Sequence, residues 1–215
     1  MTTDVRPGLR ERKKEATRRL IADTARGLFA ERGFDAVTVA EVARAADVAE
    51  KTVFNYFPTK EDLFYADMEA FEERLLGAIR ERPAGETVLE AFRRFFLAPQ
   101  GVLALGDDAE ATARLHSVTR VITGSPALLA RERQVHARYT DALAALLAEE
   151  TGSEGVEPWV AAHALLGVHR ALIDHVRRRV LDGAEAPAIA RELQAEGTKA
   201  VVLLERGLAS YAPRR

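Results

Sequence analysis

The sequence predicts an all-α protein of about nine helices, with a small N-terminal domain that contains a helix-turn-helix and a larger C-terminal helical domain. Apolar residues recur at helical spacing through most of the 215 residues, and no segment shows the alternation typical of a strand. Breaker segments rich in proline and glycine, such as residues 83–85 and 124–126, separate the helical stretches. The expected domains are residues 1–58 and 59–215, and a chain of this length can bury a core in each.

The first predicted helix runs from about Arg10 to Arg32 and ends at Gly33, a residue that often terminates helices. Residues 1 to about 9 are expected to be disordered. Two rows of residues at helical spacing form the expected apolar face of this helix, namely Ala16, Leu20, Thr24 and Leu28, and Ile21, Ala25 and Phe29.

A short second helix is predicted to begin at Thr38, because Thr38 and Glu41 have the spacing of a capping box. Its apolar residues are followed by a break at residues 46–48. Asp47 lies in this break, and aspartate tolerates the left-handed backbone conformation that tight turns often need. The pattern therefore indicates a tight turn after the short helix.

The third predicted helix spans about Ala49 to Tyr56. Val53 and Phe57 recur four residues apart and are expected to face the core, which leaves the polar residues of the helix on its outer face. Pro58 ends the helix, because the residue before a proline is pushed out of the α region. Together, the second and third helices have the helix-turn-helix pattern.

Six helices are predicted in the C-terminal domain. The first is opened by the capping spacing of Thr59 and Asp62 and is expected to continue unbroken to about Arg82, with Phe71 on its apolar face. The other five are expected at residues 87–98, 107–123, 126–150, 157–181 and 186–210.

The composition excludes several classes of protein. There are no cysteines, so disulfides and thiolate metal sites are excluded and a reducing, cytoplasmic location is expected. Neither a signal peptide nor a membrane span is expected. No nucleotide-binding loop or serine-nucleophile motif occurs, so the chain is expected not to be an enzyme and to need no cofactor. A metal site is also not expected, because His163, His169 and His175 do not align on one helix face.

Positive charge is concentrated at the N-terminus, although the net charge of the whole chain is −2. A basic arm beside a helix-turn-helix suggests contacts with phosphate groups, while a solvated helix end is the alternative for each single residue. The cations of this arm are Arg6, Arg10, Arg12, Lys13, Lys14, Arg18 and Arg19.

From Thr38 to Phe64 the chain reads TVAEVARAADVAEKTVFNYFPTKEDLF, preceded at residues 28–34 by LFAERGF. This stretch closely resembles the signature of the TetR family of bacterial transcriptional regulators. The match covers roughly the first third of the chain, and the remainder is similar to the family only in its helical layout. The resemblance implies a ligand-responsive regulator, most often a repressor, that binds a palindromic operator as a homodimer.

The resemblance also implies which residues contact DNA. The third helix would enter the major groove, where lysine reads guanine, asparagine reads adenine and threonine contacts the thymine methyl group. By position in the motif, the base-reading residues are Glu50, Lys51, Thr52, Phe54, Asn55 and Tyr56, and the phosphate contacts are Thr38 and Lys60. Two features depart from the pattern or from the expected chemistry: Ala49 stands where the family often has a serine cap, and Glu50 is acidic. Phe54 is expected to face the core at least in part.

An effector pocket is expected in the C-terminal domain, where polar residues interrupt apolar helices. A mostly apolar pocket with a few polar anchors is typical of small-molecule sites, while a subunit interface or a plain core is the alternative. The candidate lining residues are Phe71, Phe92, Phe96, Leu115, Arg120, Trp159, His163 and Arg170. A fatty acyl thioester or a similar amphiphile is the suggested effector class.

The last two helices are the expected dimer surface. Small residues on the first of them allow close helix approach, and an apolar stripe on the second would match them. These residues are Ala161, Ala164, Gly167, Val168 and Ala171, and Leu193, Val201, Leu204 and Leu208. Two other functions remain open: a helical interaction protein whose helix-turn-helix does not bind DNA, and an activator of the same family.

Overall fold

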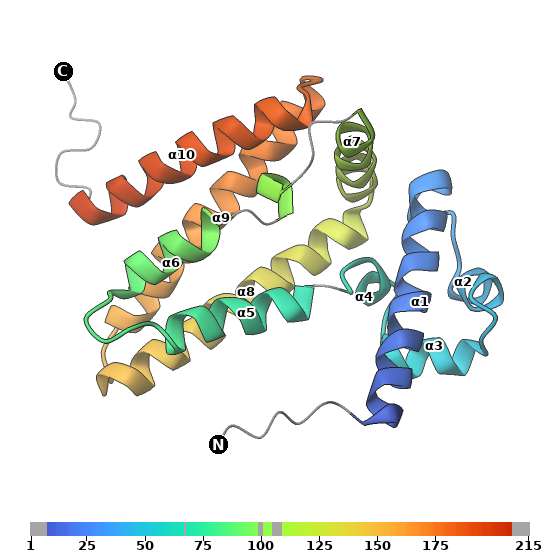
Figure 1. The fold of residues 1–215 in the computed structure, drawn as a ribbon, viewed down its shortest axis with the longest axis horizontal. Helices are drawn as coiled ribbons and strands as arrows, with labels where there is room; N and C mark the ends of the chain where they lie inside the picture. Colours follow the sequence, from blue (N-terminus) through green and yellow to red (C-terminus); the bar gives the residue numbers. More distant parts are fainter. Residues whose placement is uncertain (1–7, 67, 99–100, 105–108, 208–215) are drawn as a thin grey trace. The chain divides into compact units, whose positions relative to one another are not determined.

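The computed structural model describes residues 8–66, 68–98, 101–104 and 109–207. Within these residues the chain forms ten α-helices and one 3-10 helix, so the all-α prediction is confirmed (Figure 1). Their bounds are α1 Leu9–Arg32, α2 Val39–Ala45, α3 Glu50–Tyr56, α4 Lys60–Phe64, α5 Met68–Arg80, α6 Val88–Phe96, η1 Gly101–Ala104, α7 Ala109–Gly124, α8 Pro126–Thr151, α9 Glu157–Leu181 and α10 Ala186–Arg206.

Two compact units divide the chain. The N-terminal unit consists of Met1–Met68 and Val121–Leu129, and the C-terminal unit consists of Glu69–Arg120 and Ala130–Arg215. The chain therefore enters the N-terminal unit twice, and α7 ends and α8 begins inside it. Helix α4, which the sequence analysis assigned to the C-terminal domain, packs on α1 within the N-terminal unit.

The core of the N-terminal unit is built on one face of α1. Ile21, Ala25 and Phe29 are at most 1% exposed, whereas Leu20, expected on the same face, is 51% exposed. Fully burying a side chain such as Phe29 contributes about 1.5–3 kcal/mol. The other buried side chains of this core include Val37, Val42, Val53, Phe57, Leu63 and Leu128.

Local signals set the predicted helix ends in this unit. The Thr38–Glu41 capping box is present at the start of α2. Asp47 adopts the left-handed conformation, with φ of 53°, in the turn after α2. Gly33 follows α1 with φ of 80°, a value that favours glycine.

The continuous helix predicted over residues 59–82 is wrong, because the structure divides this stretch into α4 and α5. Tertiary hydrogen bonds hold the chain between the two helices. The hydroxyl of Tyr65 donates to the carbonyl of Leu128 at 3.2 Å, and the guanidinium of Arg18 donates to the carbonyl of Ala66 at 2.9 Å. Because these partners are distant in sequence, local periodicity did not indicate the break, which gives the described residues ten α-helices where about nine were expected.

In the C-terminal unit, α9 packs along α10 and α6 contacts both. Gly197 permits the close approach of α6 to α10, because a Cβ atom at this position would lie 2.7 Å from Cδ2 of Leu97. A separate small cluster joins α9 to α10 through Val176, Val180 and Ile189. Through these contacts α6, α9 and α10 pack against one another (Figure 1).

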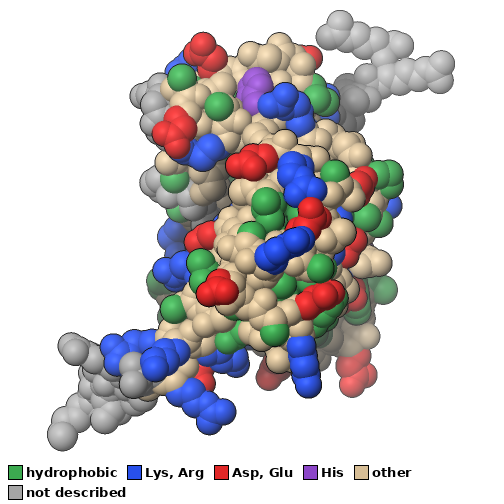
Figure 2. Space-filling model, turned by 90° about the vertical axis from the view of Figure 1, so that its right-hand side faces the viewer, with side chains coloured by type: hydrophobic (Ala, Val, Ile, Leu, Met, Phe, Trp, Pro, Cys, Tyr) green, Lys and Arg blue, Asp and Glu red, His purple; other side chains and the backbone are tan. Residues whose placement is uncertain are grey.

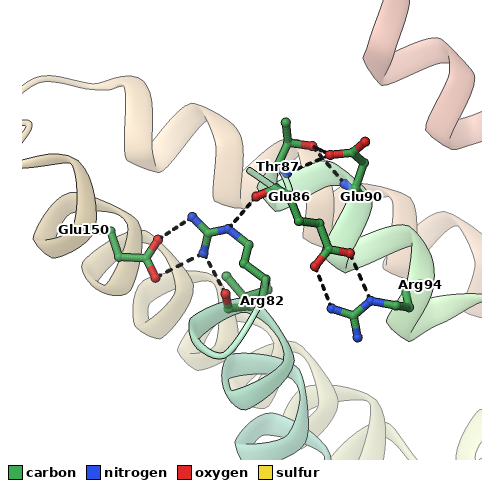
Figure 3. Close-up of polar contacts among 7 residues, drawn as sticks. Arg82, Glu86, Thr87, Glu90, Arg94 and Glu150 are labelled. Carbon is green, nitrogen blue, oxygen red and sulfur yellow. Dashed lines mark hydrogen bonds and ion pairs between the residues drawn. The ribbon is translucent and has the colours of Figure 1, made fainter. Parts of the chain in front are cut away.

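Arg82 fixes the connection between α5 and α6 (Figure 3). Its guanidinium donates to both carboxylate oxygens of Glu150 on α8, at 2.8 and 3.2 Å, and to the backbone carbonyls of Ile79 and Glu86, at 2.6 and 3.1 Å. Glu86 in turn accepts two hydrogen bonds from Arg94, at 2.9 and 3.0 Å. This network holds the α5–α6 connection against the end of α8.

Candidate functional site

The α2–α3 motif presents a polar face because its apolar residues point inward. Val53 and Phe57 are at most 2% exposed, as predicted, and α3 has no side-chain cap at Ala49. Glu50, Lys51 and Asn55 are exposed, and they share one short helix. The structure therefore places these three predicted side chains where another molecule can reach them.

The other predicted residues of α3 differ in exposure. Phe54 is 45% exposed, so the expectation that it faces the core is wrong: Val53 and Phe57 already occupy the buried face. Thr52 is half-buried, and Tyr56 packs partly against the N-terminal core. The ring of Phe54, exposed beside Lys51 and Asn55, adds an apolar surface to the polar face of α3.

Thr38 is engaged within the motif itself. Its hydroxyl donates to Glu41 at 2.9 Å, its backbone N–H donates to the same carboxylate at 2.8 Å, and Arg32 pairs with Glu41 at 2.8 Å. The hydrogen bond from the Thr38 backbone and that from Arg32 lower the pKa of Glu41 to about 2. The phosphate contact of Thr38 stays a prediction, and the hydroxyl must rotate away from Glu41 to make it.

Lys60 lies over an aromatic surface at the start of α4. Its Nζ is 4.2 Å from the ring centroid of Phe34 and 6.0 Å from that of Phe29. A cation over a ring face is attracted to the negative face of the π system. The charge of Lys60 is thereby held next to the helix-turn-helix, and its phosphate contact also stays a prediction.

The basic arm is only partly described, because Arg6 lies outside the described residues. Lys and Arg side chains gather beside the N-terminal end of α1 (Figure 2). Arg18 differs from its neighbours, since it bonds the carbonyl of Ala66 and lies 5.1 Å from the ring centroid of Phe57. The cations of the basic arm that remain exposed on α1 are Arg10, Arg12, Lys13, Lys14 and Arg19.

A cluster of rings lies inside the C-terminal unit and is called here the aromatic cluster. Its members come from α5, α6, α8 and α9 and comprise Phe71, Phe92, Phe95, Phe96, His136, Tyr139 and His169. Phe92 and Tyr139 are fully buried, whereas Phe71, Phe95 and Phe96 keep part of their surface accessible. The cluster brings together three of the predicted pocket residues, Phe71, Phe92 and Phe96.

The other predicted pocket residues lie elsewhere. Trp159 is 46% exposed, and its carbonyl is 2.9 Å from Nδ1 of the exposed His163. Leu115 packs against the separate cluster between α9 and α10, and Arg120 is exposed. Arg170 is held in ion pairs with carboxylates of α8 and α9.

The sequence analysis missed His169, which stacks in the aromatic cluster, and named His163 instead. A signal for His169 was present. The buried residues of α9 include Ala162, Leu165, Leu166, Leu172 and Val176. At 3.6 residues per turn this stripe passes through position 169 and leaves position 163 on another face.

Glu132 on α8 is the charged group beside the cluster and is 6% exposed. It pairs with Arg177 at 2.5 Å and with Arg170 at 3.0 Å. Burial raises the pKa of Glu132, but the two guanidinium groups outweigh burial, so its pKa lies below the ordinary value. Burial of His169, reinforced by His136, lowers the pKa of the His169 imidazole to about 4.

Residues 21–66 match the sequence model of the bacterial regulatory proteins of the tetR family. The matched segment contains the whole α2–α3 motif and α4. The chain belongs to the TetR family. The two relatives described next are transcriptional regulators, which agrees with the expectation that the chain is not an enzyme. Among the described residues, no group of three or more potential metal ligands could hold an ion.

Two TetR-family relatives extend beyond the matched segment. The transcriptional regulator TcmR of Streptomyces glaucescens is 33% identical over 147 residues, which are 68% of this chain and 65% of TcmR. The chain thus spans slightly less than two thirds of that relative. The regulator MftR of Mycobacterium tuberculosis is 29% identical over 166 residues, which are 76% of this chain and 81% of MftR.

The fold is also that of solved TetR-family structures. NalD, described as the secondary repressor of a multidrug efflux pump in Pseudomonas aeruginosa, superposes with a TM-score of 0.54 at 21% identity, covering 86% of this chain and 97% of NalD. At this identity the likeness concerns the fold alone. No helix in the described part of the chain has the length and apolarity to cross a bilayer.

Proposed function

We propose that this protein is a transcriptional repressor that binds double-stranded operator DNA through α3. The observation that supports it most is the exposed polar face of α3, which carries Lys51 and Asn55 opposite the buried Val53 and Phe57. Lysine and asparagine pair with the edges of guanine and adenine in the major groove. The remaining base contacts in this proposal are Glu50, Thr52, Phe54 and Tyr56, with Thr38 and Lys60 on phosphates.

A homodimer is part of the proposal, because a single helix-turn-helix reads few base pairs and a palindromic operator requires a two-fold axis. An exposed apolar stripe along α9 supports it: Val156 is 71% exposed and Val160 is 62% exposed. Gly167 and Ala171 continue the exposed face. Val201 of α10 was predicted in this interface, but it is 3% exposed and packs within its own chain. Leu208 lies outside the described residues.

The effector site of this proposal is the aromatic cluster. Its members are mostly apolar with a few polar groups, a composition typical of small-molecule sites. A fatty acyl thioester or a similar amphiphile, the class suggested by the sequence, is compatible with the apolar part of this cluster. The expected location, as for other transcriptional regulators of bacteria, is the cytoplasm.

Coupling between effector binding and operator binding requires a structural element whose conformation both ligands shift. The helix over residues 59–82 was expected to fill this role, but it is broken. Helix α8 is continuous instead, with Leu128 in the N-terminal core and Glu132 and Tyr139 in the C-terminal unit. A shift of α8 on effector binding would therefore act on the core beneath the helix-turn-helix. By reciprocity, saturating operator must weaken effector binding by the same factor, typically about 5–150-fold.

The test begins with selection of an operator from random duplexes, followed by fluorescence-anisotropy titrations. Asn55→Ala is expected to change the preference among operator variants and to cost about 1–3 kcal/mol on the best site. Lys60→Ala should weaken binding to all sequences alike and reduce the salt slope by about one. Lys199→Ala is the control, because Lys199 lies in the C-terminal unit and pairs with Glu196.

The alternatives give different results. A dimer without affinity for any duplex at low salt would indicate a helical interaction protein instead of a regulator. If Lys60→Ala altered base preference while Asn55→Ala did not, the placement of α3 on DNA would be wrong. A promoter–reporter assay separates repression from activation, since an activator would raise expression from the selected operator.

A further inference from the structure

Three rings in the aromatic cluster are stacked nearly parallel. The ring of His169 lies 5.3 Å from that of Phe71 with an angle of 19° between the planes, and 6.2 Å from that of His136 with an angle of 13°. Phe96 closes a further side of His169 at 4.9 Å. Flat rings prefer offset stacking at such distances, so a planar ligand that enters the cluster can stack on these rings.

One polar atom in this stack has no partner. Nδ1 of His169 is shielded from solvent and forms no hydrogen bond. By contrast, ring nitrogens of other histidines contact backbone carbonyls, as in His116 with Ala184 at 2.9 Å and His136 with Leu166 at 3.0 Å. Buried polar groups are nearly always paired, so an unpaired one needs an explanation, and a bound ligand is one explanation.

The surrounding charges favour a neutral ligand group. Glu132 and Asp174 are both paired with Arg170 and Arg177, so these two carboxylates and two guanidinium groups leave little net charge to bind an ion. Because burial keeps His169 neutral at physiological pH, its ring carries one donor and one acceptor nitrogen. A hydroxyl group can serve either tautomer, since it both donates and accepts.

We infer that the effector is a planar aromatic molecule with a neutral hydroxyl group, that it stacks in the aromatic cluster, and that Nδ1 of His169 binds this hydroxyl. The inference rests on the proposed function, which places the effector in this cluster. It differs from the acyl thioester suggested by the sequence in requiring a ring for Phe71 and a single hydrogen-bonding group for His169. His169 is thus the residue that determines specificity.

The experiment compares 2-naphthol with 2-methylnaphthalene, which has a methyl group in place of the hydroxyl. Affinities for the full-length dimer are measured by calorimetry, and release of a labelled operator is followed by anisotropy. The wild type should bind 2-naphthol about tenfold more tightly, as one buried hydrogen bond provides. His169→Phe should bind both probes equally, and His169→Asn, whose amide can occupy the place of Nδ1, should regain part of the preference. His163→Phe is the matched control and should behave as the wild type does.

Equal wild-type affinities for the two probes, or a preference that survives in His169→Phe, would overturn the inference. Binding of decanoyl-coenzyme A with release of operator, without binding of 2-naphthol, would also overturn it while leaving the proposed function intact. If wild-type protein binds 2-naphthol with the expected preference but no operator can be selected, the ring site stands and the proposed function fails. If His169→Phe does not fold, the inference is decided by the comparison of the two probes on the wild type and by His169→Asn.

Discussion

Replacing Glu132 with glutamine should destabilise the C-terminal unit strongly. The carboxylate is 6% exposed and neutralises two arginines, of which the Arg177 side chain is only 12% exposed. Removing the charge leaves Arg177 with only the more distant carboxylate of Asp174, at 3.8 Å, and breaking a buried pair in this way costs about 3–5 kcal/mol. Glutamine keeps the shape and can accept one of the two hydrogen bonds, so we expect about 3 kcal/mol. For a chain of this size that corresponds to a fall in Tm of about 6–12 °C.

The assay is urea denaturation followed by circular dichroism, with thermal melts as a second readout. The matched control is Glu110→Gln, which removes an exposed ion pair with Arg114 and should cost less than about 1 kcal/mol. Since the pKa of Glu132 lies below its ordinary value, its contribution to stability is present above pH 4.5 and is lost as the pH falls below it. A Glu132→Gln variant as stable as the Glu110→Gln variant would refute the assignment of a buried, charge-compensated site.

Two further predictions concern the C-terminal unit. The pKa of His169 falls from 6.5 to about 4 on folding, so between these pH values the unfolded chain binds a proton that the folded chain excludes. The free energy of unfolding should therefore drop by about 3 kcal/mol as the pH falls from 6.5 to 4. In His169→Phe the drop measured by urea denaturation should be smaller by this amount. Ala171→Arg, which places a charge on the exposed face of α9, should yield monomers in sedimentation and weaken operator binding sharply. If Ala171→Arg remains dimeric at low concentration, the dimer interface does not lie on α9.

Signals carried by neighbouring residues predicted the structure well. The capping boxes at Thr38 and Thr59 and the turn at Asp47 involve residues at most three apart, and the structure has all of them. The break between α4 and α5 depends on Leu128 and Arg18, which no local pattern contains.

The members of the aromatic cluster were predicted less well than the exposed face of α3. Aromatic residues of α5 and α6 were found because large apolar side chains at helical spacing turn inward, as Phe71, Phe92 and Phe96 do. Trp159 and His163 were selected as polar or amphipathic residues that share a helix face with Arg170, and both are exposed. The identity of a partner helix is decided by tertiary packing, so His136 of α8 could not be placed beside His169 from the sequence.

The burial of Leu128 in the N-terminal core has a consequence for synthesis of the chain. The ribosome releases residues 8–66 long before it releases α8, and until then the core around Phe29 and Phe57 lacks a side chain that is 0% exposed in the folded protein. Burial of one leucine contributes about 1.5–3 kcal/mol, a large share of the stability of so small a unit. The DNA-binding helices therefore become fully stable only after the first turn of α8 has left the ribosome. Under the proposed function, a nascent chain has little capacity to occupy an operator before α8 is being made.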